Sequence, residues 1–439
     1  MLPVATVAAP QITLRASDVS EGTVAHRQAV AAEAHGSVLR GNVPTGPFAG
    51  PCIYLVGPEA AEAVLGSQRA VFSSAQGWVR VLGNRFGRAV LNTDDPLHLD
   101  QRRLWAPAFG KVMLDIHARG IARYVDDFVD SWKDDEAIDV YAAMRALAFR
   151  AVAGTVGGMS NDILADACGA LCTVLDGDGD GETESVYLER KNAARKTLAN
   201  ALDAAIAQRR RTRPTTPGSL LDLLLEHFEL AADANAEIRS HLTILLIAGY
   251  DTGATLYSRA LYILAEQPPL ADRLARELHA AGWAASSPLS VEALDRLPCL
   301  DGFMQEVGRL YPPLLNVPRV TISEATIGGF RIPPGTLVAL ALAATQQLER
   351  VYPDPLRFNM ARYANPVHPE YTRPFQMLTF GGGGRMCLGI RFAQMEFKVI
   401  VATVAARLRL HLQAAAPVPH SGFWAARPVV PMSVRAVGR

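Results

Sequence analysis

Residues 380–389 read Phe-Gly-Gly-Gly-Gly-Arg-Met-Cys-Leu-Gly, which places four glycines and an arginine in front of Cys387. Consecutive glycines lose much backbone entropy on folding, so a chain keeps them where its backbone turns sharply or passes close to something. A helical pattern follows at 390–406, and a cysteine at a helix N-terminus is favoured as the thiolate. Such a thiolate is suited to ligate haem iron, although a flexible loop with an inert buried cysteine fits this segment equally well.

The length and composition are those of a globular protein without an electrostatic preference for nucleic acid. The chain has 439 residues, more than one core usually supports, so it holds several domains or one large domain built around a bulky group. Charged residues make up 20% and the formal net charge is zero, which argues against nucleic acid or an anionic membrane as a partner. The five cysteines are odd in number and scattered, which favours a reducing compartment over a disulfide framework: Cys52, Cys168, Cys172, Cys299 and Cys387.

Neither a signal peptide nor a membrane anchor is expected, and a cytoplasmic location is predicted. Residues 1–10 are mildly apolar but carry two prolines and no basic leader. The longest largely apolar run elsewhere, 242–250, is about half of the length that spans a bilayer.

The hydrophobic periodicity predicts a mainly α protein with a minor antiparallel β part. A short strand is expected at 53–56, a mixed loop at 75–95, and strand-like alternation at 317–342. Asp94 and Asp95 are expected to cap the helix that starts near Pro96. Helices are expected at 59–65, 96–108, 112–173, 186–211, 236–266, 270–281, 300–311 and 390–406.

An acidic segment at 176–181 alternates aspartate with glycine and resembles the start of a calcium-binding EF-hand loop. The twelfth position of such a loop would be Tyr187, where calcium needs a bidentate glutamate. A loop between two helices is therefore favoured over a cation site.

The predicted helix 236–266 contains Ala248-Gly249-Tyr250-Asp251-Thr252 at its middle, where a glycine costs about 1 kcal/mol relative to alanine. Residues three and four apart share a helical face, so Ala248, Gly249 and Thr252 are expected to form a notch with one hydroxyl. Asp251 lies about 100° further around the helix. The notch is suited to hold dioxygen and relay protons; a close helix–helix contact, with Thr252 bonded to its own i−4 carbonyl, is the alternative.

Two further groups of charged residues have informative spacing. Glu306 and Arg309 are three apart and predict an ion pair on one helical face, and Arg357 is expected to join the same glutamate in a buried structural network. His98 and Arg102 are four apart and also share a face. Together with two further cations they are suited to surround two carboxylates of a ligand, the added cations being Arg319 and Arg385.

In this order, these segments resemble the motifs of the cytochrome P-450 superfamily of haem-thiolate monooxygenases. The resemblance runs from about residue 40 to the end and implies the fold of that family, with haem between the long helix and the helix after Cys387. Five motifs carry it: Phe-x-x-Gly-x-Arg-x-Cys-x-Gly at 380–389, Ala/Gly-Gly-x-Asp/Glu-Thr at 248–252, Glu-x-x-Arg at 306–309, Pro-x-Arg-Phe at 355–358 and His-x-x-x-Arg at 98–102.

The resemblance also implies roles for individual residues. The cofactor is expected to be haem b (iron protoporphyrin IX), with Cys387 as the proximal iron ligand and Phe380 packed beside its sulfur. Thr252 and Asp251 are expected to be the alcohol–acid pair that delivers protons as dioxygen is cleaved. One oxygen atom then enters a lipophilic substrate, by hydroxylation or epoxidation, and the other leaves as water. The remaining cofactor contacts are expected from His98, Arg102, Arg319, Arg385, Gly389 and Ala248.

The domain and partner expectations follow from the same resemblance. Residues 1–439 are expected to form one catalytic domain, with 1–40 as an extension and first elements, and without a fused reductase. Electrons are expected from a ferredoxin-type donor with its reductase, which docks on the proximal face. One departure is Gln-Gln-Leu-Glu at 346–349 in place of the family's frequent His-Arg-Asp-Pro, which is expected to affect surface packing and not chemistry. The cations expected to line the docking face are Arg103, Lys111, Arg391 and Lys398.

The expected substrate contacts are mostly apolar, which predicts a hydrophobic substrate of moderate size. A peroxygenase or oxygen-independent haem-thiolate catalyst is one alternative, but such relatives usually lose the acid–alcohol pair that this chain keeps. A non-catalytic haem-binding or sensor protein is the other. The expected contacts are Trp78, Val79, Val81, Leu82, Leu245, Gly249, Leu315, Val317, Phe423 and Trp424.

Overall fold

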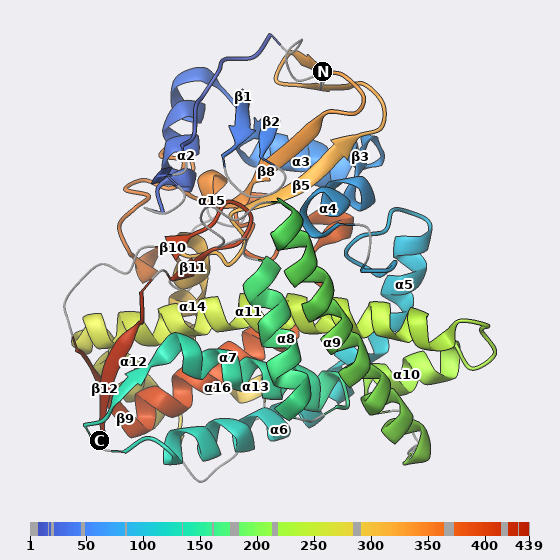
Figure 1. Ribbon diagram of the computed structural model, residues 1–439. Helices are drawn as coiled ribbons and strands as arrows, with labels where there is room; N and C mark the ends of the chain where they lie inside the picture. Colours follow the sequence, from blue (N-terminus) through green and yellow to red (C-terminus); the bar gives the residue numbers. More distant parts are fainter. Residues whose placement is uncertain are drawn as a thin grey trace.

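The computed structural model describes residues 8–15, 17–18, 22–44, 49–83, 86–133, 135–159, 162–175, 184–212, 218–283, 291–363, 373–413, 420–428 and 430–438. The expectations for the acidic segment 176–181 and for residues 1–7 fall outside these ranges. Helices dominate the described chain, and the largest sheet lies at one end of the molecule (Figure 1). The mainly α class is therefore confirmed.

The long helix α11 (Ala234–Glu266) runs through the middle of the helical part (Figure 1). All of its residues from 253 to 265 are buried, because other helices pack around it. The sequence pattern predicted α11 and most of its neighbours with ends correct to about two residues, but it placed α7 inside one longer helical stretch. The neighbours include α7 (Val140–Ala151), α9 (Glu184–Arg211), α12 (Pro268–Ala280), α14 (Pro298–Leu310) and α16 (Ile390–Arg407).

The stretch 112–173, predicted as helical throughout, is divided in the structure. It forms α6 (Lys111–Asp130), α7, a short π-helix η5 (Val152–Val156) and α8 (Asp162–Leu175), with the strand β4 (Ala137–Asp139) after α6. The carboxylate of Asp139 accepts a hydrogen bond from the backbone N–H of Tyr141 at 3.0 Å and so caps α7. A capping aspartate between two apolar runs was the signal for this break.

The largest described sheet has the strand order β1-β2-β8-β5-β3. Its pairs are antiparallel except β2–β8, which is parallel with Tyr54 opposite Ala339, so the sheet is mixed and not purely antiparallel. The smaller described sheets join β4, β12 (Ser433–Gly438) and β9 (Leu408–Leu412), β6 (Ala325–Ile327) and β7 (Phe330–Ile332), and β10 (His420–Ser421) and β11 (Arg427–Pro428). The strands of the largest sheet are β1 (Val38–Val43), β2 (Gly50–Leu55), β3 (Phe72–Ser73), β5 (Asn316–Thr321) and β8 (Leu337–Ala341).

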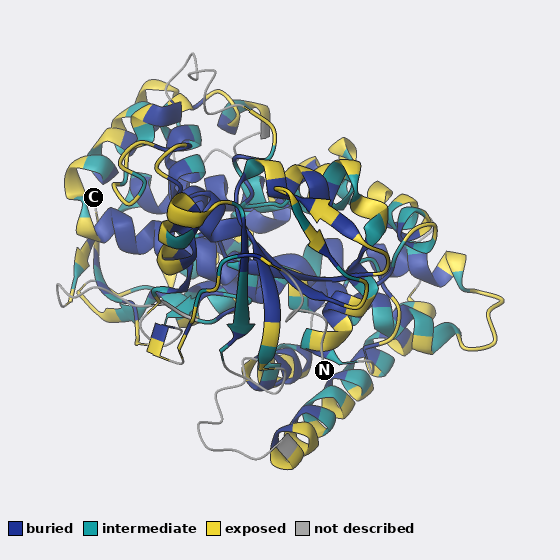
Figure 2. Cartoon of the chain, turned by 90° about the horizontal axis from the view of Figure 1, so that it is seen from above, coloured by how far each residue is buried: buried dark blue, intermediate teal, exposed yellow. Residues whose placement is uncertain are grey.

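The buried residues form one large cluster around α11 and a smaller one between the sheet and the helix α2 (Val24–His35). Figure 2 shows the buried residues gathered in the interior and the exposed ones on the outer faces of the helices. Phe423 belongs to the smaller cluster, where its ring centroid lies 6.1 Å from that of Tyr54, and Trp424 packs against the same cluster. Phe423 and Trp424 therefore pack at the sheet, and their place in the substrate pocket stays a prediction.

A second correction concerns the predicted loop 75–95, which contains the helix α4 (Ser74–Leu82). The hydroxyl of Ser73 accepts a hydrogen bond from the N–H of Gln76 at 3.0 Å and caps this helix. The next helix, α5 (Leu97–Trp105), has no side-chain cap, so the expectation that Asp94 or Asp95 caps it is also wrong. No helix within the described ranges is both long and apolar enough to cross a bilayer.

Candidate active site

The loop before α16 holds Cys387 by backbone contacts. The N–H of Cys387 donates to the carbonyl of Phe380 at 2.8 Å, and Gly389 directly precedes α16. Gly383 has a φ of 57°, and a Cβ there would lie 2.1 Å from the carbonyl oxygen of Leu65, so only glycine fits. The run of glycines thus lets the loop cross close to the helical segment that ends near Ser67.

Cys387 is accessible, in contrast to most of the other cysteines. Burial raises the pKa of its thiol, while a hydrogen bond from the Gly389 N–H and the charge of Arg102 lower it. Yet Cys387 is exposed, whereas Cys52, Cys168 and Cys172 are buried. An accessible thiol next to a helix N-terminus and an arginine is suited to ligate a cofactor.

The long helix α11 is also open at the position of the predicted notch. Ala248 is exposed and Thr252 is partly exposed, although the next turns of the helix are fully buried. The Thr252 hydroxyl donates to the carbonyl of Ala248, which is the i−4 contact of the alternative hypothesis. A small residue and a hydroxyl therefore face accessible space at mid-helix.

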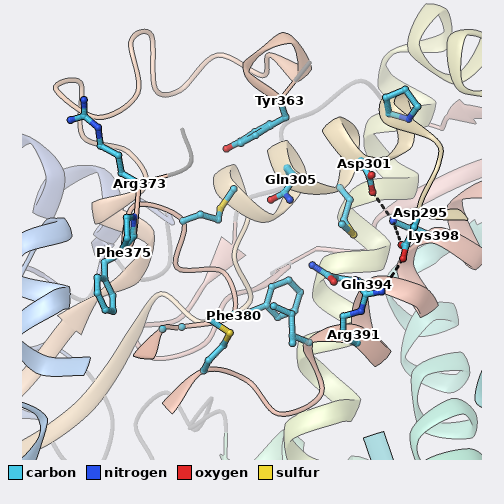
Figure 3. Close-up of a pocket in the computed structure, with 18 of the residues that line it drawn as sticks. Asp295, Asp301, Gln305, Tyr363, Arg373, Phe375, Phe380, Arg391, Gln394 and Lys398 are labelled. Carbon is cyan, nitrogen blue, oxygen red and sulfur yellow. Dashed lines mark hydrogen bonds and ion pairs between the residues drawn. The ribbon is translucent and has the colours of Figure 1, made fainter. Parts of the chain in front are cut away.

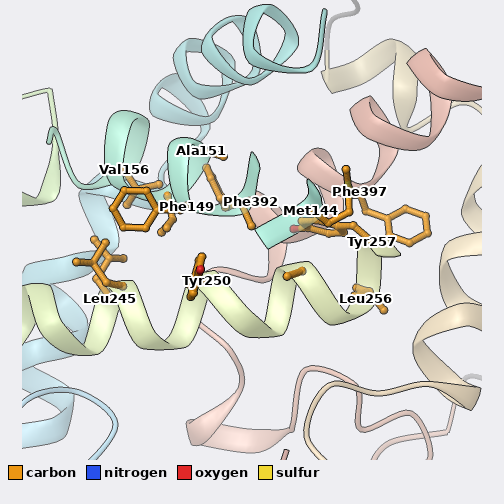
Figure 4. Packing of buried hydrophobic residues seen from close by; sticks show 14 of the residues in the cluster. Met144, Phe149, Ala151, Val156, Leu245, Tyr250, Leu256, Tyr257, Phe392 and Phe397 are labelled. Carbon is orange, nitrogen blue, oxygen red and sulfur yellow. The ribbon is translucent and has the colours of Figure 1, made fainter. Parts of the chain in front are cut away.

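Gly249 does not contribute to this open face. A Cβ at Gly249 would lie 2.7 Å from Cγ2 of Val152 in η5, so the glycine permits close packing between two helices. In Figure 4, Val156 and Phe149 lie above α11, on the side of the helix toward which Tyr250 points. The expectation that Gly249 lines the substrate pocket is therefore wrong.

Asp251 is paired with two arginines from distant segments. Its two carboxylate oxygens lie 3.2 Å from Nε of Arg145 in α7 and 2.9 Å from Nη2 of Arg427 in β11. Burial raises the pKa of Asp251, and the charge of Arg145 acts in the opposite direction. Neither partner could be predicted from residue spacing, because neither lies on the same helix as Asp251.

The four cations expected to bind the haem propionates fit two carboxylates. Arg319 is 5% exposed and, within the described part of the chain, has no carboxylate at ion-pair distance; its Nη1 donates to its neighbour Pro318. Burial and then the charge of Arg385 lower the pKa of Arg319 to about 10. A buried cation without a counter-ion is unfavourable, so the site is suited to an anionic group.

The other three basic residues lie in the same region and make their own contacts. Arg385 donates to the carbonyl of Thr93 at 2.7 Å, and Arg102 donates to the carbonyl of Met386 at 2.8 Å. His98 is buried, and burial followed by the charge of Arg385 lowers its pKa. Arg102 and Arg385 thus tie the cysteine loop to the chain around α5, and the donor set fits haem.

The predicted ion pair of Glu306 with Arg309 is confirmed, but its second arginine is not the predicted one. Arg309 donates to both carboxylate oxygens of Glu306 at 2.7 and 2.8 Å, and both side chains are fully buried. Arg362 also reaches Glu306, at 3.4 Å, whereas Arg357 is exposed and only its carbonyl accepts from Arg309. The expectation that Arg357 pairs with Glu306 is therefore wrong: the chain brings Arg362, five residues later, to this carboxylate.

Gln346, placed by the sequence interpretation in surface packing, is fully buried. Its amide nitrogen donates to the carbonyl of Arg309 at 3.0 Å, and its amide oxygen accepts from the N–H of Leu378 at 2.6 Å. Gln346 thereby links the end of α14 to the strand of chain that enters the cysteine loop, and the expectation of a surface position is wrong.

Glu396 is a buried carboxyl that the sequence interpretation missed. It lies in α16 and accepts a hydrogen bond from the hydroxyl of Tyr257 in α11 at 2.8 Å. Its other oxygen, Oε1, is buried without a hydrogen-bond partner. Burial raises the pKa of Glu396 to about 8, against the opposing effect of the Tyr257 hydrogen bond.

The remaining expected pocket residues differ in exposure. Trp78, Leu82, Leu245 and Val317 are buried, and Leu315 is partly buried; their place in the substrate pocket stays a prediction. Val79 is 39% exposed, which fits the outer face of α4 better than a pocket wall.

A hollow of about 940 Å³ lies beside the cysteine loop, with Phe380 on one side and an ion-paired group on the other (Figure 3). In this group Lys398 contacts Asp295 at 2.8 Å and Asp301 at 2.6 Å, and Arg391 contacts Asp295 at 2.8 Å. The other two cations expected to line a docking face are also paired, Lys111 with Glu292 and Arg103 with Asp100. Each of the four expected cations therefore has an acidic partner within the chain.

Comparison with known proteins agrees with this geometry. A family model described as Cytochrome P450 matches residues 185–431. The chain is 28% identical over 395 residues to "Putative cytochrome P450 136" of Mycobacterium tuberculosis, covering 85% of this chain and 79% of that protein. It is 29% identical over 381 residues to "Cyclooctat-9-en-7-ol 5-monooxygenase" of Streptomyces melanosporofaciens, covering 82% and 80%.

The structure is also similar to the solved retinoic acid-bound cyanobacterial CYP120A1, with a TM-score of 0.84, 22% identity and full coverage of both chains. This chain belongs to the cytochrome P450 family. It is an oxidoreductase of the P450 type, and membership of the family implies a haem cofactor.

Proposed function

We propose that this chain is a haem-thiolate monooxygenase that inserts one oxygen atom from O2 into a lipophilic small molecule, by hydroxylation or epoxidation. The observation that carries the proposal is Cys387, an exposed cysteine beside Arg102 at the start of α16, in a chain whose buried Arg319 has no carboxylate at ion-pair distance among the described residues. A haem with an axial thiolate would satisfy both at once.

The cofactor is haem b, which when bound supplies the iron centre at which dioxygen is activated. Cys387 would ligate the iron, and the Gly389 N–H would stabilise its thiolate. The two carboxylates of the cofactor would be held by charge-assisted hydrogen bonds from His98, Arg102, Arg319 and Arg385. Ala248 would leave room on the opposite face, because its side chain is small.

Thr252 and Asp251 would deliver protons to the reacting oxygen. Thr252 Oγ1 borders the open face of α11 and can hold a proton there, while Asp251 would resupply it. Each oxygen of Asp251 faces an arginine, so the carboxyl reaches Thr252 only after the contact with Arg145 or Arg427 opens.

The substrate class is supported by the apolar character of the side chains expected to contact the substrate, of which Trp78, Leu82, Leu245 and Val317 are buried in the interior. The relative named "Cyclooctat-9-en-7-ol 5-monooxygenase" acts, by its name, on a cyclic alcohol, which is consistent with this class. The electrons would come from a separate ferredoxin-type protein with its reductase, the whole chain would be one catalytic domain, and its location would be cytoplasmic.

The ligand assignment is tested by the reduced carbon monoxide complex. Cys387→Ser is expected to abolish the thiolate-type Soret band, whereas Cys299→Ser, at a half-buried cysteine elsewhere, is expected to keep it. An unchanged spectrum of the Cys387 variant would refute the assignment.

The monooxygenase assignment is tested by coupling of reductant to product. Thr252→Ala is expected to sustain reductant consumption while product falls and hydrogen peroxide rises. Thr197→Ala, which removes the same kind of i−4 hydroxyl contact on exposed α9, is expected to leave coupling unchanged. Turnover with peroxide alone would favour a peroxygenase, and no effect of Thr252→Ala on product or reductant use would favour a non-catalytic haem protein.

Substrates can be found by a spectral-shift screen of lipophilic compounds.

A further inference from the structure

The carboxylate of Asp94 is shared between the helix α4 and the cysteine loop. Its Oδ1 accepts from the backbone N–H groups of Ser74 and Ala75 at 2.8 and 3.2 Å, and its Oδ2 accepts from the hydroxyl of Ser73 at 2.5 Å. The same Oδ1 lies 3.3 Å from Nη2 of Arg385. One carboxylate therefore binds the first turn of α4 and an arginine expected to hold a haem carboxylate.

The helix α4 is fastened to a second such arginine through its backbone. A Cβ at Gly77 would lie 2.5 Å from the carbonyl oxygen of Pro318 and 2.8 Å from Cα of Arg319. Because no side chain separates them, α4 rests directly on β5 at the residue whose guanidinium has no counter-ion. The helix α4, which carries Trp78 and Leu82, thus contacts Arg319 directly and is linked to Arg385 through Asp94.

We propose that Asp94 is a positioning residue that couples α4 to Arg385, so that the capture of the haem carboxylates and the shape of the substrate pocket depend on each other. The proposal rests on the proposed function, in which Arg385 binds a carboxylate of the cofactor. Asp94 has no contact with substrate in this arrangement and acts through the residues that it holds.

The coupling follows from the fact that the single charge of Asp94 stabilises both α4 and Arg385. An anion at a helix N-terminus is stabilised by the unpaired N–H groups and by the helix dipole. The same anion stabilises the guanidinium of Arg385, because the charge of Asp94 opposes the effect of burial on the pKa of Arg385. A movement of Arg385 toward or away from the cofactor therefore changes the position of the Asp94 carboxylate at the start of α4. Because coupling is reciprocal, a ligand that contacts α4 changes the contacts of Arg385 in turn.

The test is a double-mutant cycle in the haem-containing protein. Asp94→Asn keeps an oxygen that accepts hydrogen bonds from the α4 amides and removes the charge that pairs with Arg385. The probes are imidazole, which occupies only the iron, and 4-phenylimidazole, whose phenyl group extends into the pocket. The measured quantities are the two dissociation constants, from spectral titration, and the midpoint potential of the haem.

Asp94→Asn is expected to raise the dissociation constant of 4-phenylimidazole by about five-fold or more relative to that of imidazole, which is within the range of typical coupling energies. It is also expected to raise the midpoint potential, because a negative charge near the haem is lost. In an Arg385→Lys background, which disrupts the contact with Oδ1, the same substitution is expected to change the probe ratio by much less.

Equal effects of Asp94→Asn in the two backgrounds would show that Asp94 only caps α4, and would overturn the coupling. If the Arg385 variant does not retain haem, hydrogen exchange of the α4 amides decides instead: coupling predicts that haem binding slows this exchange in the parent much more than in Asp94→Asn, whereas capping alone predicts the same slowing in both proteins. A chain that binds no haem refutes the proposed function as well, whereas additive effects in a haem-containing protein refute only the coupling.

Discussion

Replacement of Glu396 by glutamine is expected to remove a pH dependence of stability from the contact between α11 and α16. The carboxyl of Glu396 is fully buried and accepts one hydrogen bond, from Tyr257. Burial raises its pKa from 4.5 to about 8, so the folded protein holds a neutral carboxyl over most of the neutral range. Glutamine has the same shape and no charge, so it reproduces the neutral form at every pH.

The sign and size of the effect follow from the difference between the folded and unfolded pKa values. A carboxyl whose pKa is raised in the fold contributes stability that is fully present below pH 4.5 and is lost as the pH rises through about 8. Between about pH 5 and about pH 8 this loss amounts to about 3 kcal/mol. For a chain of 439 residues, the usual unfolding entropy per residue converts this to about 3 °C in melting temperature.

Calorimetric melting of the parent and the Glu396→Gln variant at the two pH values measures this difference. The melting temperature of the variant relative to the parent is expected to rise by about 3 °C from about pH 5 to about pH 8. Other titrating groups cancel in the comparison because both proteins contain them, and Glu292→Gln, at an exposed glutamate, is the control with no expected change. Parallel pH profiles of parent and variant would show that Glu396 is not a neutral carboxyl in the fold.

Two other substitutions test packing around the site. Glu306→Gln leaves the fully buried Arg309 without its counter-ion, so the free energy of unfolding is expected to fall by about 3–5 kcal/mol in denaturant titration; a loss as small as that of Glu292→Gln would contradict the buried network. Gly249→Ala places a Cβ 2.7 Å from Val152 and is expected to destabilise the fold by about 1–3 kcal/mol, with partial recovery when Val152→Ala is added. An unchanged melting temperature of the glycine variant would mean that α11 and η5 are not in close contact there.

The elements that could be predicted from the sequence are those whose cause is local. The period of apolar residues gave α11 and α16, and the helical spacing of Glu306 and Arg309 gave their ion pair, because residues three apart share a face of any helix. The glycine run before Cys387 gave a tight loop at a helix N-terminus, since the conformational need for glycine is a property of the backbone itself.

The elements that could not be predicted depend on packing between segments that are distant in the chain. Gly249 has a helical spacing that suits a cofactor notch, yet its side of α11 is the one on which η5 packs. The second partner of Glu306 is Arg362 and not Arg357, because the path of the loop decides which guanidinium returns to the carboxylate. Spacing along the chain contains no information about such contacts.

By itself, the sequence determined a mainly α protein with one thiol before a helix, a hydroxyl and a carboxyl at the middle of a long helix, and a helical Glu–Arg pair. Only the tertiary structure decided which of these face open space and which charges are already paired. Asp251 meets Arg427 across 176 residues, and Asp94 meets Arg385 across 291, because the fold brings these segments to the same place. Local spacing fixes neighbours within one turn of helix, whereas the balance of charge in an interior is a property of all the segments that enclose it.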